Sequence, residues 1–170
     1  MQEKGINYWE TYAPVVQWMS VRIMLTLAAI ENLHTKSIDF VLAYPQANLD
    51  VDIYTKLPQG FNVEPESRRY VLKIQNNLYS LKQAGHNWFE KLSGALSNLS
   101  INPSKMDPCV FIGEDIIVLV YVDDCLIFSQ DKDKINQLIY KLKNKENLDL
   151  TDEGDVDKYL GVEIERNKKR

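Results

Sequence analysis

The sequence predicts an α+β fold in which helices pack on one face of an antiparallel sheet. Three observations support this class. Amphipathic helical segments alternate with pairs of strands rather than with single strands. Two acidic residues interrupt the most apolar segment at the position of a turn. The chain has 170 residues, 45% of them hydrophobic and 26% charged, which suits one globular domain.

The helices are predicted from apolar residues that recur about every 3.6 positions. Ser20 is a candidate cap for the first helix, and Gly85 is a weak point near the start of the second. The three predicted helices span residues 20–33, 81–99 and 132–145.

The strands are predicted from short β-branched and apolar runs bounded by turn residues. Pro45 ends the first strand, and a loop marked by Gly60 and Pro65 separates the second from the third. Two tight turns are predicted later, at 113–115 and 122–125. The predicted strands span residues 36–44, 51–57, 70–75, 107–112, 116–122, 125–128, 148–152 and 158–165.

Charge and cysteine content restrict the possible functions. The net charge is −4, whereas a nucleic-acid binder is usually basic, and the charged runs are typical of solvated surface. Cys109 and Cys125 lie in apolar contexts without metal-ligand spacing, which predicts reduced, buried thiols in an intracellular protein. No secretory signal is visible, and "MLTLAAI" is far shorter than the roughly 20 residues of a membrane span.

Three carboxylates interrupt apolar strands. Asp123 and Asp124 lie within "IIVLVYVDDCLIF", residues 116–128, and Asp39 lies within "SIDFVLAY". If the two segments are neighbours, three anions converge, repel one another and raise their pKa values. Oxygen ligands suit Mg²⁺, and two such ions can support an in-line displacement at phosphorus. The residues therefore favour metal-dependent phosphoryl transfer.

Other interpretations of these acids stay open at this point. Asp123 and Asp124 also suit a solvated hairpin turn, and Asp39 could be an edge residue or the start of a cap. A strand that ends in "VDD" also resembles a phosphoacceptor receiver domain with an acidic Mg²⁺ pocket. That fold requires a helix directly after the acids, whereas "CLIF" continues as a strand.

Five blocks of sequence, in order, resemble the reverse transcriptase of copia-type LTR retrotransposons, a segment of their Pol polyprotein. The resemblance covers nearly the whole chain and implies a right-hand polymerase palm with RNA-directed DNA polymerase activity. In that activity a primer 3′-hydroxyl attacks a dNTP with the help of two Mg²⁺ ions. The blocks are "GINYWETYAPVV", "IDFVLAYPQANLDVDIYTKLPQGF", "LYSLKQAGHNWFEKL", the pair "DPCVF" and "LVYVDDCLIF", and "YLGVEIE".

The resemblance assigns roles around the acids by position. Asp39 and Asp123 match bridging metal ligands, and Asp124 matches the less certain third carboxylate. The main-chain carbonyl of Phe40 is an additional candidate oxygen. Tyr44 matches an aromatic steric gate that excludes a ribose 2′-hydroxyl, with core packing as the alternative.

The resemblance assigns three further contacts. Gln83 resembles a glutamine that touches the incoming nucleotide. Leu160 and Gly161 resemble residues that hold the primer end, although a strand bulge also explains the glycine. "LPQGF", residues 57–61, is assigned to a loop, so Gln59 receives no role in nucleotide contact.

The chain departs from the family at several positions. Ser80 stands where glycine is common, Gly85 and His86 stand where proline and a basic residue are usual, and Pro45 is unexpected. Residues 1–170 are predicted to be a single reverse transcriptase domain fragment, a palm with partial fingers. Upstream fingers strands, a full thumb and RNase H are expected to be absent.

The resemblance also implies partners and a location. The partners are an RNA or DNA template with its primer, dNTP, and other Pol segments such as integrase and RNase H, with no membrane. The expected location is a cytoplasmic particle or the nucleus. The alternative function is a catalytically inactive remnant that serves as a packing or assembly module.

Overall fold

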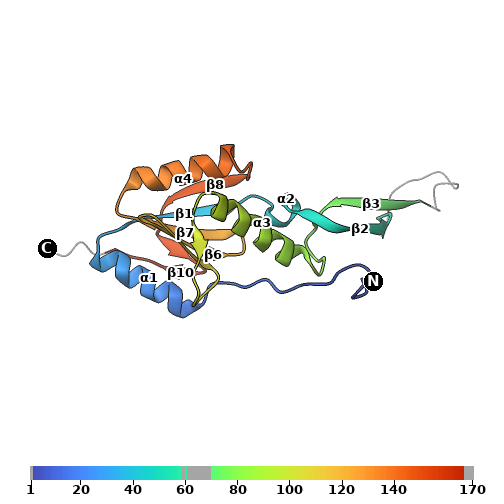
Figure 1. Cartoon of the computed structure of the whole chain (residues 1–170), viewed down its shortest axis with the longest axis horizontal. Helices are drawn as coiled ribbons and strands as arrows, with labels where there is room; N and C mark the ends of the chain where they lie inside the picture. The colour runs from blue at the N-terminus through green and yellow to red at the C-terminus, as the bar shows by residue number, and fades with distance from the viewer. Residues whose placement is uncertain (1, 59, 61–69, 167–170) are drawn as a thin grey trace.

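The computed structural model describes residues 2–58, 60 and 70–166. Its centre is a six-stranded antiparallel sheet with the order β4-β5-β6-β7-β1-β8 (Figure 1). The strands are β1 (His34–Phe40), β4 (Asn102–Pro103), β5 (Val110–Gly113), β6 (Ile116–Tyr121), β7 (Asp124–Ser129) and β8 (Leu150–Asp155).

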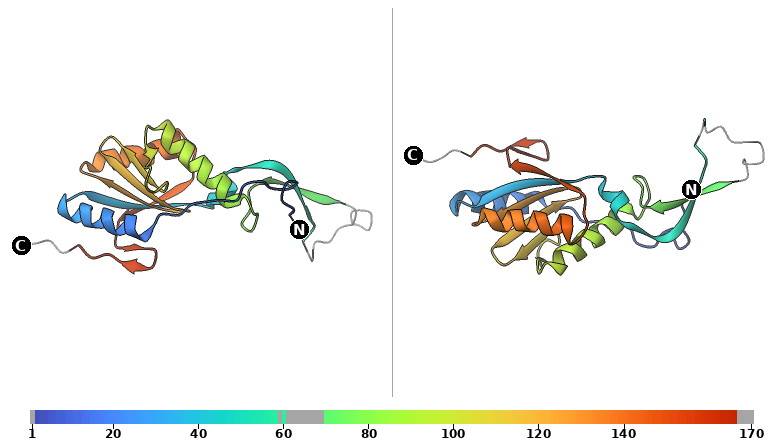
Figure 2. Two further views of the ribbon diagram at one scale, coloured as in Figure 1. Left: turned by 60° about the horizontal axis from the view of Figure 1, so that its bottom comes forward. Right: turned by 90° about the horizontal axis from the view of Figure 1, so that it is seen from above.

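Four helices and two further hairpins complete the described chain. The β2–β3 hairpin reaches away from the sheet, and residues 2–17 run in the same direction (Figure 2). The helices are α1 (Trp18–Ile30), α2 (Ala43–Gln46), α3 (Ala84–Asn98) and α4 (Lys132–Asn144). The hairpins are β2 (Asn48–Lys56) with β3 (Val71–Asn76), and β9 (Lys158–Tyr159) with β10 (Val162–Glu163).

The connections of the central strands follow a βαββαβ pattern, β1-α3-β6-β7-α4-β8, with the spatial order β6-β7-β1-β8. This is the split βαβ arrangement. Helix α3 packs on the sheet through aromatic side chains. Trp88 meets Phe40 of β1 edge-on, with ring centroids 5.1 Å apart, and Phe89 lies 6.4 Å from Phe111 of β5.

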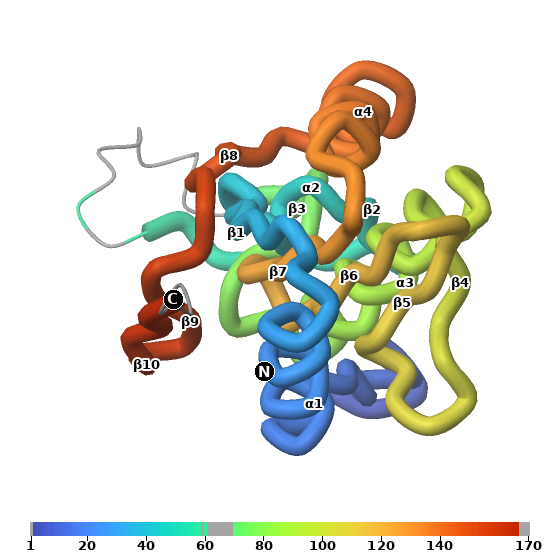
Figure 3. Tube along the Cα trace, turned by 90° about the vertical axis from the view of Figure 1, so that its left-hand side faces the viewer, coloured from blue at the N-terminus to red at the C-terminus, as the bar shows by residue number. Residues whose placement is uncertain are grey.

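Helices cover both faces of the sheet, which corrects the expectation that all of them lie on one face. Helices α4 and α1 lie on opposite sides of strands β1 and β7 (Figure 3). Strand β7 explains this arrangement because residues 125–129 are buried without a break. A strand that is apolar on both faces needs cover on both sides, and α1 supplies part of the second layer through Val21, Met24 and Ala28.

Several predicted boundaries are wrong for identifiable reasons. Helix α1 begins at Trp18, and Ser20 does not cap it, since its hydroxyl donates to Asp107 Oδ2 at 2.6 Å. Strand β1 ends at Phe40, and Pro45 lies inside α2. Residues 158–165 form a hairpin instead of one strand. The short strand β4 was not predicted.

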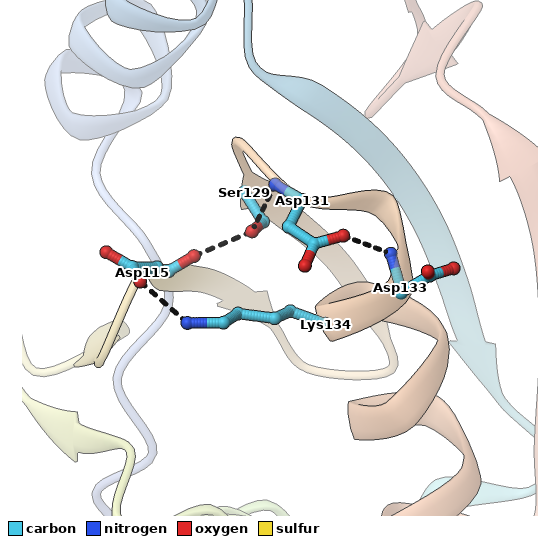
Figure 4. Close-up of polar contacts among 5 residues, drawn as sticks. All are labelled: Asp115, Ser129, Asp131, Asp133 and Lys134. Carbon is cyan, nitrogen blue, oxygen red and sulfur yellow. Dashed lines mark hydrogen bonds and ion pairs between the residues drawn. The ribbon is translucent and has the colours of Figure 1, made fainter.

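A network of hydrogen bonds and one ion pair lies at the end of β6 and β7 opposite the Asp123 turn (Figure 4). The Ser129 hydroxyl donates to the Asp115 carbonyl at 2.7 Å and accepts from the Asp131 amide at 3.1 Å. Asp131 caps α4 by accepting from the Asp133 amide at 2.8 Å. Lys134 pairs with Asp115 at 2.6 Å. These contacts join the β5–β6 turn to the start of α4.

Both cysteines are free and buried, as the sequence predicts. Burial raises the pKa of Cys109 to about 12 and that of Cys125 well above its usual value, so both thiols are protonated. Among the described residues, no helix is both long enough and apolar enough to cross a membrane.

Candidate active site at the β6–β7 turn

The strand register brings together the acids that the sequence singled out. Asp39 of β1 faces Asp124 of β7 directly, and Asp124 also faces Tyr121 of β6. Directly opposed residues of antiparallel strands project to the same face, so the two carboxylates share one face of the sheet. Asp123 lies in the turn beside them, and its carbonyl accepts a hydrogen bond from the Phe40 amide at 3.0 Å.

The turn itself lies one residue earlier than predicted. Because Tyr121 pairs with Asp124, the two turn residues are Val122 and Asp123. Val122 has a φ of 57°, which is an outlier for a β-branched residue. Such a conformation costs on the order of 1–3 kcal/mol and persists only where surrounding contacts hold it.

The carboxylates repel one another. Burial raises the pKa of Asp39, and the charges of Asp123 and Glu153 raise it further. Burial also raises the pKa of Asp124, followed by the charges of Asp123, Asp39 and Glu153. Both shifts have the direction expected for clustered, partly desolvated anions.

Glu153 is a further acid whose charge raises the pKa of Asp39 and Asp124, and the sequence did not single it out. It lies in β8, which pairs with β1, and its carboxylate accepts a hydrogen bond from the Ser37 hydroxyl at 3.2 Å. The alternation of residues in β8 could have indicated its side of the sheet. Finding it would have required knowing that β8 is the neighbour of β1.

The three predicted acids have no compensating cation in the described part of the chain. Its ion pairs are Lys36–Asp152, Lys73–Asp52 and Lys134–Asp115, all elsewhere. Nor does any side-chain or backbone donor among the described residues bond to the carboxylates of Asp39, Asp123 or Asp124. The cluster therefore carries negative charge that an external cation could neutralise.

The donor set suits Mg²⁺ in chemical type, since carboxylate oxygens are the hard ligands that this ion prefers. Across residues 2–58, 60 and 70–166, however, no three His, Cys, Asp or Glu side chains are gathered into a group that could hold a metal ion. The pairing of Asp39 with Asp124 is observed. Coordination of two ions stays a prediction.

Tyr44 lies in α2, the short helix that follows β1. Its ring packs on that of Tyr79, with centroids 4.7 Å apart and planes inclined by 38°. Burial raises the pKa of the Tyr44 hydroxyl, and the Asp123 charge adds to the effect. The ring is half-buried, which suits both a steric gate and a packing role, and the gate stays a prediction.

Gln83 is fully buried, and its side-chain amide is already bonded within the chain. Its Nε2 donates to the Asn7 carbonyl at 2.9 Å and to Asp50 Oδ1 at 3.3 Å. Its Oε1 accepts from Gln2 Nε2 at 2.8 Å. The predicted contact with a nucleotide would require some of these partners to be exchanged. No local pattern predicts that Gln2 and Asn7 would reach this side chain.

Leu160 and Gly161 form the tip of the β9–β10 hairpin. Tyr159 pairs with Val162, and the two residues between them have φ values of 47° and 81°. Two positive φ values identify a tight turn of the I′ type, so the glycine serves a hairpin turn instead of a strand bulge. Leu160 packs against the core. Contact with a primer stays a prediction.

The departures from the family pattern have local explanations. Ser80 has a φ of 84°, a conformation that glycine adopts readily. A Cβ atom at Gly85 would lie 3.2 Å from the Ala13 Cβ, and His86 Nδ1 lies 2.9 Å from the Tyr12 carbonyl. Gly85 and His86 therefore accommodate the N-terminal segment against α3. Gln59 and Pro65 lie outside the described residues.

Comparison with known proteins identifies the class. A family model described as "Reverse transcriptase (RNA-dependent DNA polymerase)" matches residues 1–169. The chain therefore belongs to this reverse transcriptase family, and the predicted resemblance is confirmed.

The relatives place the chain among copia-type elements. It is 35% identical to the retrovirus-related Pol polyprotein from transposon TNT 1-94 of Nicotiana tabacum, over 98% of this chain and 13% of the relative. It is 31% identical to that from transposon RE1 of Arabidopsis thaliana, over 97% and 11%. The Ty1-H Gag-Pol polyprotein of Saccharomyces cerevisiae is 26% identical over 94% and 9%. The chain thus spans about an eighth or less of the length of these relatives.

Proposed function

We propose that this chain is the palm, with partial fingers, of an RNA-directed DNA polymerase that transfers a nucleotide from dNTP to a primer 3′-hydroxyl. The observation that carries the proposal is the facing pair Asp39–Asp124 with Asp123 at the adjoining turn. These acids lie on neighbouring strands without a cation from the described chain. Family membership supports the reaction class.

Each residue has a defined task in this proposal. Asp39 and Asp123 hold the metal ions, with Asp124 as a third carboxylate. Two bound Mg²⁺ ions would supply charge stabilisation for the attacking and leaving oxygens. The Phe40 carbonyl adds an oxygen beside Asp39, and the Tyr44 ring lies beneath the sugar and excludes a ribose 2′-hydroxyl.

Nucleic acid and polyprotein partners belong to the same proposal. Leu160 and Gly161 contact the primer end from the β9–β10 hairpin, and Gln83 contacts the nucleotide after its present hydrogen bonds are exchanged. The substrates are an RNA or DNA template with its primer and dNTP. The relatives are Pol and Gag-Pol polyproteins, which supports other polyprotein segments as neighbours. Integrase and RNase H are the segments proposed.

Primer extension with Mg²⁺ on a polyribonucleotide template tests the proposal. Asp123→Asn should reduce incorporation by about 100-fold or more, because several kcal/mol of metal-dependent stabilisation are lost. The matched control is Asp133→Asn, which changes an exposed carboxylate on α4 and should keep the wild-type rate.

Equal incorporation by wild type and Asp123→Asn would reject the catalytic assignment. A folded wild-type chain that incorporates no nucleotide, alone or joined to its neighbouring polyprotein segments, would favour the inactive remnant. Circular dichroism and thermal unfolding establish that each variant is folded before its rate is compared.

A further inference from the structure

We propose that Trp88 is a positioning residue for this site: its indole N–H holds the carbonyl of Val122 and so maintains the strained turn that presents Asp123. This inference rests on the proposed function of the Asp39–Asp123–Asp124 cluster. Trp88 itself touches no reacting group.

One buried side chain contacts both halves of the site. Trp88 is 1% exposed and projects from α3. Its Nε1 donates to the Val122 carbonyl at 2.7 Å, directly before Asp123. Its ring meets the ring of Phe40, directly after Asp39, at 5.1 Å and an interplanar angle of 67°. Movement of α3 would therefore displace both acid-bearing segments.

The turn depends on partners outside its own hairpin. The Val122 carbonyl is held by Trp88, and the Asp123 carbonyl is held by the Phe40 amide at 3.0 Å. Val122 has a φ of 57°, which a β-branched residue adopts only when other contacts impose it. Without the indole N–H, the carbonyl loses its partner and the turn can relax toward negative φ. That relaxation would redirect the Asp123 side chain.

Trp88→Phe tests this role because phenylalanine retains an aromatic ring but has no N–H. The expected fall in kcat is about tenfold or more, the size expected when a buried acceptor is left unpaired. The KM for dNTP should stay within about twofold, because the substrate contacts are elsewhere. The Mg²⁺ concentration that gives half-maximal rate should rise severalfold, since Asp123 would be misplaced.

Phe89→Leu is the matched control. Phe89 is the next residue of α3 and packs against Phe111, on β5. This substitution should lower thermal stability without changing kcat per folded molecule. Packing alone predicts similar behaviour for the two variants, so a fall in kcat confined to Trp88→Phe supports positioning. Equal kcat values in folded Trp88→Phe and wild type would overturn it.

Val122→Gly provides a second and independent variant, because glycine adopts positive φ without a steric penalty. If Trp88 acts by maintaining the strained turn, Trp88→Phe should reduce kcat severalfold less in the Val122→Gly background. An undiminished loss in that background would contradict the inference.

Two readouts do not depend on activity. Trp88 is the buried tryptophan, whereas Trp9 and Trp18 are 52% and 47% exposed. After replacement of Trp9 and Trp18 by phenylalanine, Mg²⁺ should change the emission of Trp88. Amide hydrogen exchange at residues 122–124 should be faster in Trp88→Phe than in Phe89→Leu. An inactive wild type would reject the proposed function. Equal amide exchange at residues 122–124 in Trp88→Phe and Phe89→Leu would separately reject the positioning role of Trp88.

Discussion

The two ends of strands β6 and β7 both carry acidic residues, but only one end supplies them with donors. At the far end, Asp131 accepts from a backbone amide and Asp115 pairs with Lys134 (Figure 4). At the near end, Asp123 and Asp124 have no donor to their carboxylates within the described chain. At the far end of this strand pair the acids are therefore paired within the described chain. At the near end their negative charge is not compensated by it.

Asp107 reinforces this contrast. It is more deeply buried than the acids of the candidate site, at 4% exposed. Its carboxylate nevertheless accepts hydrogen bonds from the backbone amides of Gln17 and Cys109 and from the Ser20 hydroxyl. Where an acid serves the fold, this chain supplies partners. Within residues 2–58, 60 and 70–166, the carboxylates of Asp39, Asp123 and Asp124 have no such partners, as the proposed metal-binding role requires.

The largest expected effect separates the two ends by activity. Asp39→Asn should reduce primer extension by about two to three orders of magnitude, as loss of a metal ligand implies. It should not lower the stability of the metal-free protein, because one of the repelling charges is removed. The measurements are incorporation rate and thermal unfolding.

The control for this prediction is Asp115→Asn at the far end. Asp115 has a φ of 59°, which asparagine also tolerates, so the backbone should be preserved and activity should be unchanged. A comparable loss of activity in Asp39→Asn and Asp115→Asn would contradict the prediction that only the near end takes part in catalysis.

A smaller effect should appear in stability at the far end. Asp131→Ala removes the cap of α4 and should destabilise the protein by about 1 kcal/mol, measured by urea unfolding. Asp131→Asn retains a side-chain oxygen for the Asp133 amide and should stay close to wild type. Activity per folded molecule should be unaffected by either change, and a specific loss of kcat would show that the far end communicates with the site.

The smallest effect concerns pH and has opposite signs in two regions. The pKa of Asp124 is raised in the folded state, by burial first and then by neighbouring carboxylates. The folded protein therefore binds more protons than the unfolded chain between the two pKa values, and stability is lost as pH rises through the folded pKa. At neutral pH without Mg²⁺, Asp124→Asn should be more stable than wild type. The difference should vanish as pH falls toward 3.8, the ordinary value for aspartate.

Asp152 is the matched control for this pH dependence. Burial raises its pKa, but hydrogen bonds from Lys36 and the Gly154 amide outweigh burial and lower it. Its contribution is present above the unfolded pKa and is lost as pH falls through the folded pKa. Asp152→Asn should therefore be less stable than wild type at neutral pH. Denaturant unfolding from neutral pH to below 3.8, the ordinary value for aspartate, measures both differences. The same sign for both variants at neutral pH would contradict the electrostatic account.

Local pattern was sufficient for the elements that position the site. Helices α3 and α4 follow from their apolar spacing, and the β6–β7 hairpin follows from apolar runs on either side of Asp123 and Asp124. The hairpin turn was predicted one residue late, because Val122 adopts a φ that its side chain disfavours. Sequence rules describe unstrained turns, and this turn is held by Trp88 from another element.

Long-range partners account for the other errors. Ser20 is a reasonable helix cap by residue type, but its hydroxyl donates a hydrogen bond to Asp107, which is 87 positions away in the sequence. The motif around Gln83 predicts contact with the nucleotide. In the structure its side-chain amide is instead hydrogen-bonded to Gln2, Asn7 and Asp50. Glu153 has no motif, and its charge acts on Asp39 and Asp124 only because β8 pairs with β1.

The sequence by itself determined the reverse transcriptase family through its ordered motifs and the α+β class through its local periodicity, and it singled out three acids as candidates. Only the tertiary structure decided that Asp39 faces Asp124, that α1 covers the second face and that Trp88 connects both halves of the site. Strand register and side-chain hydrogen bonds join residues that are far apart in the chain. No local pattern records which of many possible partners each residue meets.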